Sequence, residues 1–228
     1  CVASDFTCVL WDMDGTIVDT EPFWIESETK LVAEHGGTWT NEQAMNLVGS
    51  GLWESAEILR AAGVDLDADT LVTTLTERVM ALMKERGLPF RPGARELIAE
   101  FAERGVPQAI VTMSTLPLAR AVADLLPEGT FATLVTGDAV PRPKPFPDPY
   151  LLAAENLGVS IGDCIALEDS PTGLRAAVSS GATAIAIPHA VPIPAGEGYH
   201  RLTTLDGVTA DQLSARHATT LNKGNPTA

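Results

Sequence analysis

The sequence predicts an α/β fold in which a doubly wound parallel sheet carries an inserted helical domain. Short apolar runs that are typical of buried strands recur along the chain, and helical patterns separate most of them. One long stretch near the N-terminal end has helical patterns only. Alternating strands and helices favour a parallel sheet with helices on both faces, and the purely helical stretch predicts a second domain.

Five apolar runs are expected to form the sheet. The run at residues 7–11 ends in acidic residues and a glycine, which is the pattern of a buried strand followed by a functional loop. The other expected strands are residues 107–112, 130–136, 164–167 and 183–187. Helical patterns cover residues 93–104, 116–126, 150–157 and 171–179. Thr209 and Gln212 form a capping-box pattern that predicts a last short helix.

The helical stretch divides the chain into two expected domains. Residues 1–20 and 92–228 form the α/β core, and residues 21–91 form the inserted domain. Three helices are predicted within the insertion, at residues 23–34, 53–62 and 69–86. Residues 91–93 are the expected hinge through which the chain returns to the core.

Charge and cysteine content exclude several classes of protein. The net charge of −15 argues against a nucleic-acid binder and against docking on anionic lipid. Cys1, Cys8 and Cys164 are few and widely spaced, so neither a disulfide framework nor a zinc site is expected. No signal peptide or membrane-spanning run is predicted. We expect a cytoplasmic protein that is a monomer, with a dimer as the alternative.

The loop after the first expected strand carries two carboxylates. Asp12 and Asp14 are two residues apart at a strand end, so their side chains are expected on the same side. Carboxylate oxygens suit a hard cation such as Mg²⁺. Gly15 permits a sharp turn, and the Thr16 hydroxyl can hold the loop or Asp14. By itself the motif is equally consistent with an acidic turn.

Other polar residues follow the later strands. Thr112 ends the second strand, Lys144 lies in a proline-rich loop, and Glu168 and Asp169 close the fourth. Each alone has an ordinary explanation, such as a turn hydroxyl, a solvated charge or a helix cap. Because the carboxyl ends of parallel strands meet at one edge, together they predict a metal and phosphate site there.

These residues resemble the four ordered motifs of the haloacid dehalogenase superfamily, in the subgroup with a helical cap, which includes sugar-phosphate phosphatases and β-phosphoglucomutase. The matching segments are residues 11–19, 110–114, 144–145 and 167–170. The resemblance implies a Rossmann-like core and a Mg²⁺-dependent hydrolase acting on a small phosphomonoester through a phosphoaspartate. It assigns catalytic roles to Asp12 as nucleophile, Asp14 as acid and base, Thr112 and Lys144.

The resemblance also implies the ligand sets. Mg²⁺ is expected on Asp12, the backbone carbonyl of Asp14, Asp169 and, in or near the shell, Glu168. Substrate and phosphate contacts are expected from Thr16, Thr112, Met113, Ser114 and Lys144, and from the cap-loop residues Gly49, Ser50 and Gly51.

Two alternatives to a phosphatase stay open at this point. Mutases of this subgroup typically have a histidine shortly after the first motif and an arginine in the cap loop, whereas this chain has Trp24 and no arginine in residues 46–53. A non-catalytic phosphometabolite-binding protein would not need the full set of motif residues. Trp24 and Trp53 are equally consistent with cap core and with ligand contact. The uncharged cap loop favours a sugar or polyol phosphate.

Overall fold

The core of the protein is a six-stranded parallel sheet. The structure is a computed structural model that describes residues 6–224, so Cys1 lies outside the described residues. The strand order is β3-β2-β1-β4-β5-β6, and every neighbouring pair is parallel. In chain order the strands are β1 (Cys8–Trp11), β2 (Gln108–Val111), β3 (Thr133–Val135), β4 (Cys164–Glu168), β5 (Thr183–Ala186) and β6 (Tyr199–Arg201). The predicted doubly wound α/β fold is confirmed.

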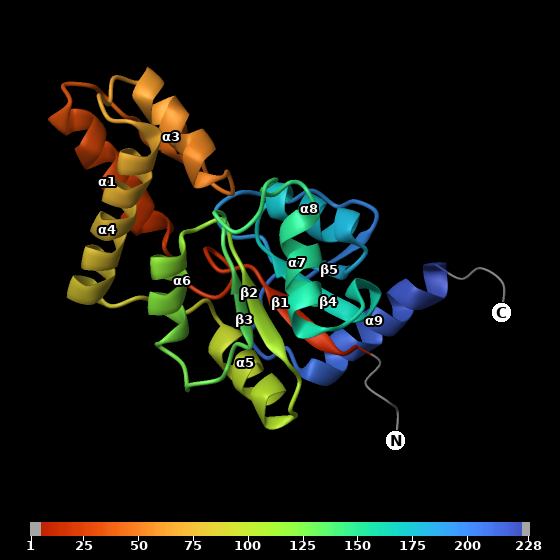
Figure 1. Ribbon diagram of the computed structural model, residues 1–228. Coiled ribbons are helices and arrows are strands. Elements are labelled where there is room, and N and C mark those ends of the chain that lie inside the picture. Colours follow the sequence, from red (N-terminus) through yellow and green to blue (C-terminus); the bar gives the residue numbers. More distant parts are fainter. Residues whose placement is uncertain (1–5, 225–228) are drawn as a thin grey trace.

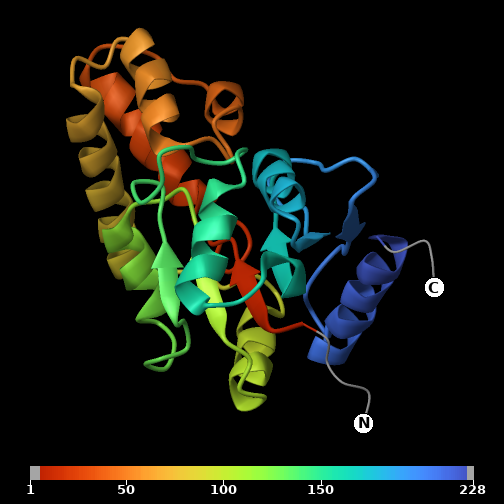
Figure 2. The same ribbon diagram turned by 45° about the vertical axis from the view of Figure 1, so that its right-hand side comes forward.

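Helices cover both faces of this sheet (Figures 1 and 2). Cys8 and Leu10 of β1 pack in one apolar cluster, whereas Val9 and Trp11 pack in the other, as the two-residue period of a strand requires. The first cluster includes α7 (Asp148–Leu157) and α8 (Pro171–Ser180). The opposite cluster includes α5 (Ala94–Glu103), α6 (Leu116–Ala123) and α9 (Ala210–Gly224). β1 is therefore the buried centre of the sheet.

Four helices follow one another between β1 and α5 and stand together apart from the sheet (Figure 1). They are α1 (Glu21–Glu34), α2 (Asn41–Met45), α3 (Leu52–Ala61) and α4 (Ala68–Arg86). Helix α4 contacts α1, α3 and also α6 of the sheet layer. Its buried side chains Leu71, Leu75 and Val79 lie four residues apart, which gives one apolar face. We refer to these four helices as the cap.

The chain leaves and re-enters the sheet domain through two adjacent segments. Asp19 donates its backbone N–H to the Pro89 carbonyl at 2.9 Å, and Arg91 donates to the Ile17 carbonyl at 2.8 Å. The Arg91 side chain also donates from Nε to the carbonyl of Gly15 at 3.1 Å. These bonds tie both cap connections to the loop that follows β1.

Several elements differ from the prediction in extent. Strand β6 and helix α2 were not expected; β6 is a three-residue edge strand without an apolar run, and α2 spans only five residues. A capping box between Thr40 and Gln43 begins α2, and it was a readable signal in the sequence. The predicted capping box at the last helix is confirmed, because Gln212 N donates to Thr209 Oγ1. That helix has 15 residues and is not short.

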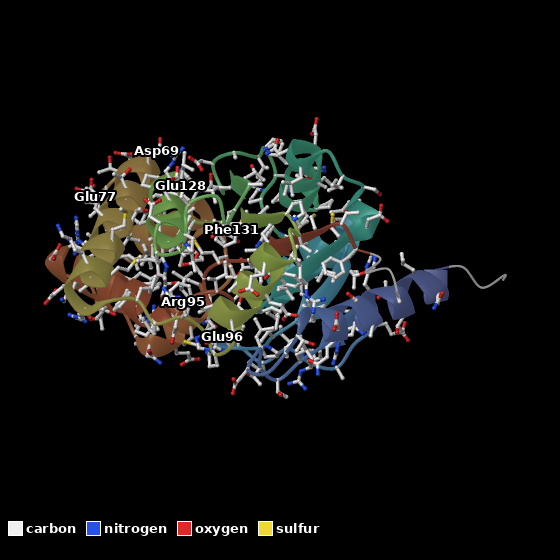
Figure 3. All side chains as sticks on the ribbon, turned by 90° about the horizontal axis from the view of Figure 1, so that it is seen from below. Asp69, Glu77, Arg95, Glu96, Glu128 and Phe131 are labelled. Atoms are coloured by element: carbon white, nitrogen blue, oxygen red, sulfur yellow. The ribbon has the colours of Figure 1, made fainter. Side chains whose placement is uncertain are left out.

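The acidic excess of the chain lies on its exterior. Figure 3 labels Asp69, Glu77, Glu96 and Glu128, and all of these side chains are exposed. Because the exposed surface is acidic, it would repel a phosphate-bearing ligand, and attraction of that ligand must come from local cations.

Within residues 6–224, no helix combines the length and apolarity needed to cross a membrane.

Gly93 generates a testable prediction about the cap connection. Its φ of +78° is left-handed, and an added Cβ would lie 2.1 Å from the carbonyl oxygen of Leu205. Gly105 also has a left-handed φ, +68°, but no atom lies within 4 Å of its added Cβ. Gly105→Ala should destabilise by about 1–2 kcal/mol from backbone strain alone. Gly93→Ala should add roughly 1–3 kcal/mol of steric strain. Urea denaturation of both variants measures the difference, and equal losses would contradict the close approach at Gly93.

Candidate active site

Polar residues from three adjacent strands converge at the carboxyl edge of the sheet. Asp12 follows β1, Thr112 follows β2 and Asp169 follows β4, and β1 lies between the other two strands. Asp12 N donates to the Leu167 carbonyl at 3.0 Å, which extends the β1–β4 ladder by one residue. The strand order reverses beside β1, and such a switch point is where open α/β sheets bind ligands.

Lys144 lies at the centre of this group. It comes from the loop between β3 and α7, and its side chain is only 3% exposed. Its ammonium donates to Asp12 Oδ1 at 2.8 Å, to Glu168 Oε1 at 2.6 Å and to the Val111 carbonyl at 2.7 Å. Burial opposes the charged form, but the charges of Asp12 and Glu168 prevail and raise the pKa of Lys144 above its usual value. The amine is therefore a fixed cation at neutral pH.

Three buried carboxylates surround that cation. Asp12, Glu168 and Asp169 each offer an oxygen, and these oxygens lie within 4.8 Å of one another. Burial and the charge of Glu168 raise the pKa of Asp12 to about 7, although Lys144 opposes the shift. Burial and the charges of Asp12 and Glu168 also raise the pKa of Asp169. When all three carboxylates are ionised, one ammonium group does not balance them, so the ionised cluster has an excess of negative charge.

The residues present fit a divalent cation. Glu168 Oε2 and Asp169 Oδ2 are buried and accept no hydrogen bond within the described part of the chain. Two glycines leave room for these carboxylates, since a Cβ at Gly15 would lie 2.0 Å from Asp169 Oδ2 and one at Gly173 would lie 2.1 Å from Glu168 Oε2. Hard cations prefer such oxygen ligands. Their binding would also compensate the charge excess.

Asp14 has different surroundings. Its Oδ1 accepts hydrogen bonds from Thr20 Oγ1 at 2.5 Å and Trp24 Nε1 at 3.3 Å. Its Oδ2 accepts from Thr112 Oγ1 at 3.2 Å and Ser114 Oγ at 2.7 Å. The side chain of Asp14 is not among the three clustered carboxylates. Four donors thus fix this carboxylate in one orientation beside the cluster.

The hydroxyl of Thr16 contacts Asp12 and not Asp14. Thr16 Oγ1 donates to Asp12 Oδ2 at 2.9 Å, while Lys144 occupies the other oxygen, Oδ1. Thr16 is 1% exposed and is not one of the residues that line the cleft described next. Its contact therefore orients Asp12.

A cleft of about 690 Å³, including its open mouth, lies between this sheet edge and the cap. Its core side is formed by residues from the four sequence motifs: Asp12, Asp14, Thr112, Met113, Ser114, Lys144, Asp169 and Ser170. Its cap side is formed by three helices and one loop: Glu21, Trp24, Ile25, Glu28, Ala44, Leu47, Val48, Gly49, Ser50, Leu52 and Ser55. The cleft thus combines the predicted motif residues with a cap surface.

The cap loop meets the core at the edge of this cleft. Gly49 and Ser50 line it, whereas Gly51 does not; a Cβ added at Gly51 would lie 4.0 Å from the side chain of Pro143. An added Cβ at Gly49 would lie 2.8 Å from the Cβ of Ser170, so a side chain there would push the cap away. Gly49 therefore permits close contact between the two parts.

The two tryptophans that the sequence left undecided have different positions. Trp24 lines the cleft and donates to Asp14. Trp53 is half-buried and donates from Nε1 to Asp69 Oδ1 at 2.7 Å, within the cap. Trp24 is therefore placed for ligand contact, and Trp53 packs in the cap.

Sequence reasoning missed three residues of this region. Tyr150 is fully buried and donates from its hydroxyl to Glu168 Oε1 at 2.5 Å. Burial and the neighbouring charge of Glu168 raise the pKa of Tyr150 well above its usual value, so it remains a donor. Glu21 and Glu28 line the cap side; their seven-residue spacing places them on one helix face, which was the available signal.

Comparison with protein-family models shows to which family the chain belongs. Residues 9–187 match the family model for haloacid dehalogenase-like hydrolases. The chain belongs to this family. The superfamily assignment made from the four motifs is thereby confirmed.

Relatives of this hydrolase include named phosphatases. Hexitol phosphatase A of Escherichia coli is 33% identical over 178 residues, which cover 78% of this chain and 81% of that protein. Fructose-1-phosphate phosphatase YqaB of the same organism is 31% identical over 179 residues, covering 78% and 94%. The crystal structure of CbbY from Rhodobacter sphaeroides in complex with xylulose-(1,5)bisphosphate has a TM-score of 0.83 and 30% identity, covering 91% and 99%. The chain is accordingly a phosphatase of the haloacid dehalogenase superfamily.

Tyr150 generates a prediction about the carboxylate cluster. Tyr150→Phe removes a donor to a buried charged acceptor and should destabilise the protein by about 1.5–3 kcal/mol. Tyr199→Phe is the matched control, because that hydroxyl donates to the Pro194 carbonyl near the surface. The control should change the free energy of unfolding by less than about 1 kcal/mol. Chemical denaturation at neutral pH measures both, and an unchanged stability in Tyr150→Phe would refute the importance of this contact.

Proposed function

We propose that this phosphatase hydrolyses a small phosphorylated sugar or polyol in a Mg²⁺-dependent reaction through a phosphoaspartate at Asp12. The observation that carries the proposal is the position of Asp12. One of its oxygens accepts from Lys144, the other from Thr16, and the residue lines the cleft. An oriented carboxylate next to a fixed cation is suited to attack on phosphorus.

The first step transfers the phosphoryl group to the protein. An oxygen of Asp12 forms a bond to phosphorus, and the bond from phosphorus to the ester oxygen of the substrate breaks. Asp14, in its protonated form, gives its proton to that leaving oxygen, which departs as an alcohol. The groups around Asp14 hold it in position for this transfer, and one of the neighbouring hydroxyls accepts a hydrogen bond from the protonated form instead of donating to it.

The second step returns the protein to its starting form. Asp14, now ionised, accepts a proton from water as the water oxygen attacks phosphorus. The bond between phosphorus and the Asp12 oxygen breaks, which releases inorganic phosphate and regenerates the carboxylate. General acid–base help of this kind typically contributes ~10²–10⁴-fold.

Cationic and dipolar groups would stabilise the phosphoryl oxygens during both steps. Among the cleft-lining residues of the described chain, 6–224, Lys144 is the only lysine or arginine. Thr112, Met113 and Ser114 line the same cleft, and the two hydroxyls and the backbone N–H of Met113 would donate to the phosphoryl oxygens. Asp12, Glu168, Asp169 and the backbone carbonyl of Asp14 would hold Mg²⁺. When bound, the metal would neutralise excess negative charge and polarise phosphoryl oxygens.

The cap side of the cleft supports a phosphatase that acts on a sugar or polyol monophosphate. No arginine or lysine comes from the cap among the residues that line it, so a second phosphate group has no cationic partner there. Polar atoms of Ser50, Ser55 and the two glutamates suit hydroxyl groups. The relatives named for hexitol and fructose-1-phosphate support the same substrate class.

Asp12→Asn tests the nucleophile. The amide keeps the size of the side chain but cannot attack phosphorus, so kcat should fall by a factor on the order of 10⁴ or more while the fold is retained. Phosphate release from a panel of sugar and polyol monophosphates is measured, with circular dichroism as the fold control. Asp65→Asn, an exposed residue of the cap, should retain wild-type turnover. Substantial residual activity in Asp12→Asn would contradict the role of Asp12. Formation of an isomeric sugar phosphate by the wild type, in place of phosphate release, would contradict hydrolysis.

Removal and return of the metal test the carboxylate cluster. EDTA should abolish phosphate release, and added Mg²⁺ should restore it. Mg²⁺ should also raise the melting temperature of the wild type, because a ligand that binds the folded state stabilises it. The increase should be lost in Asp169→Asn and retained in Asp206→Asn, whose side chain is exposed. Turnover that persists in EDTA, or an equal increase in Asp169→Asn, would exclude this site.

A further inference from the structure

One face of helix α1 lines the cleft. It runs from Glu21, near the proposed catalytic residues, to Glu28, deeper in the cap. Glu21, Trp24, Ile25 and Glu28 are three, four and seven residues apart, and all line the cleft. Glu21 belongs to the catalytic end, where its pKa is raised to about 8 by burial and by the charge of Asp14. At a rise of 1.5 Å per residue, Glu28 lies ~10 Å further along the helix axis.

The carboxylate of Glu28 is buried without a cationic partner in the described part of the chain. The residue is 5% exposed, and Trp39 donates from Nε1 to its Oε2 at 3.1 Å. Among residues 6–224, no donor contacts Oε1. Beyond α1, the cap side of the cleft is lined by residues of α2, of α3 and of the loop between them, none of which is charged: Ala44, Leu47, Val48, Gly49, Ser50, Leu52 and Ser55. One oxygen of Glu28 is thus available to a ligand.

The fold does not require a carboxyl group at this position. Burial raises the pKa of Glu28 to about 7, so folding the ionised form is unfavourable. A glutamine of the same shape could accept the Trp39 hydrogen bond without a charge. A residue that lowers stability and has no compensating partner inside the fold is typical of a functional site.

The chemistry of the cap side defines what Glu28 can bind. Glu21 and Glu28 would repel a second phosphate or a carboxylate. Ser50 and Ser55 line the same side of the cleft, and their hydroxyls suit a ligand group that both donates and accepts hydrogen bonds. A hydroxyl does both, whereas an ammonium group only donates. A hydroxyl is therefore the favoured partner.

We propose that Glu28 is a specificity-determining residue that accepts a hydrogen bond from the hydroxyl farthest from phosphorus in a polyol monophosphate. This inference rests on the proposed function, because the phosphoryl group must lie at Asp12. An extended chain of five or six carbons, with its ester oxygen and terminal hydroxyl, matches the ~10 Å between the two ends of the α1 face. A three-carbon substrate would be too short to reach Glu28.

Three substrates test the proposal on the wild-type protein: sorbitol 6-phosphate, 1-deoxysorbitol 6-phosphate and glycerol 3-phosphate. A hydrogen bond to a charged acceptor corresponds to roughly a ten- to hundredfold change in an equilibrium. The deoxy compound, which lacks only the far hydroxyl, should therefore show kcat/KM reduced by about that factor. Most of the change should be in KM.

Glu28→Ala should remove the discrimination. Its kcat/KM for sorbitol 6-phosphate should fall to the wild-type value for the deoxy compound, while that for glycerol 3-phosphate should stay within about twofold, since this substrate does not reach Glu28. The matched control is Glu34→Ala, on the same helix, where the glutamate is exposed and pairs with Arg78 at 2.6 Å. The control should retain the wild-type preference.

Different failures have different meanings in this experiment. Equal kcat/KM values of the wild type for sorbitol 6-phosphate and 1-deoxysorbitol 6-phosphate would overturn the role of Glu28. This outcome does not depend on whether Glu28→Ala folds. An equal loss for all three substrates in Glu28→Ala would also overturn it and indicate a structural role. No phosphate release from any phosphomonoester by the wild type would instead overturn the proposed function.

Discussion

The close approach of Asp12, Glu168 and Asp169 is the constraint on which the rest of the site depends. Their mutual repulsion in a buried space is tolerated because Lys144 donates to two of them and Tyr150 to one of these two. The central position of β1 makes the approach unavoidable, since the residues after β1 and β4 emerge side by side. The geometry of the sheet therefore creates a negative electrostatic potential at this edge, within a chain that is already strongly acidic.

That potential explains why the site is assembled from so many fixed groups. Each oxygen of Asp12 has one donor, and each oxygen of Asp14 has two. Carboxylates held by hydrogen bonds need little reorganisation when charge moves during a reaction. The two aspartates are only two residues apart, yet their different donors give them different electrostatic surroundings.

Much of the fold and the core of the site could be predicted because local patterns determine them. Apolar runs marked the central strands, and the polar residues after them had to meet at one edge. Strand β6 could not be predicted, because a short edge strand needs no apolar pattern. Tyr150 and Glu28 were missed because their roles depend on which other elements their helix faces contact. The helical periodicity of a sequence shows which residues share a face, but not what that face packs against. Trp24 and Trp53 were indistinguishable in sequence, and only their positions relative to Asp14 and Asp69 separate them.

The two connections between cap and core have a wider consequence. The segments that leave and re-enter the core are hydrogen-bonded to each other at Asp19 and Arg91. The two ends of the cap are therefore held together by the core, and the cap forms a closed loop of the chain. Loop closure depends only weakly on the length of the enclosed chain. A different set of helices could therefore replace much of the cap without altering the sheet, provided that the donor to Asp14 supplied by Trp24 is kept. The chain thus separates the evolution of its chemistry from the evolution of its substrate preference.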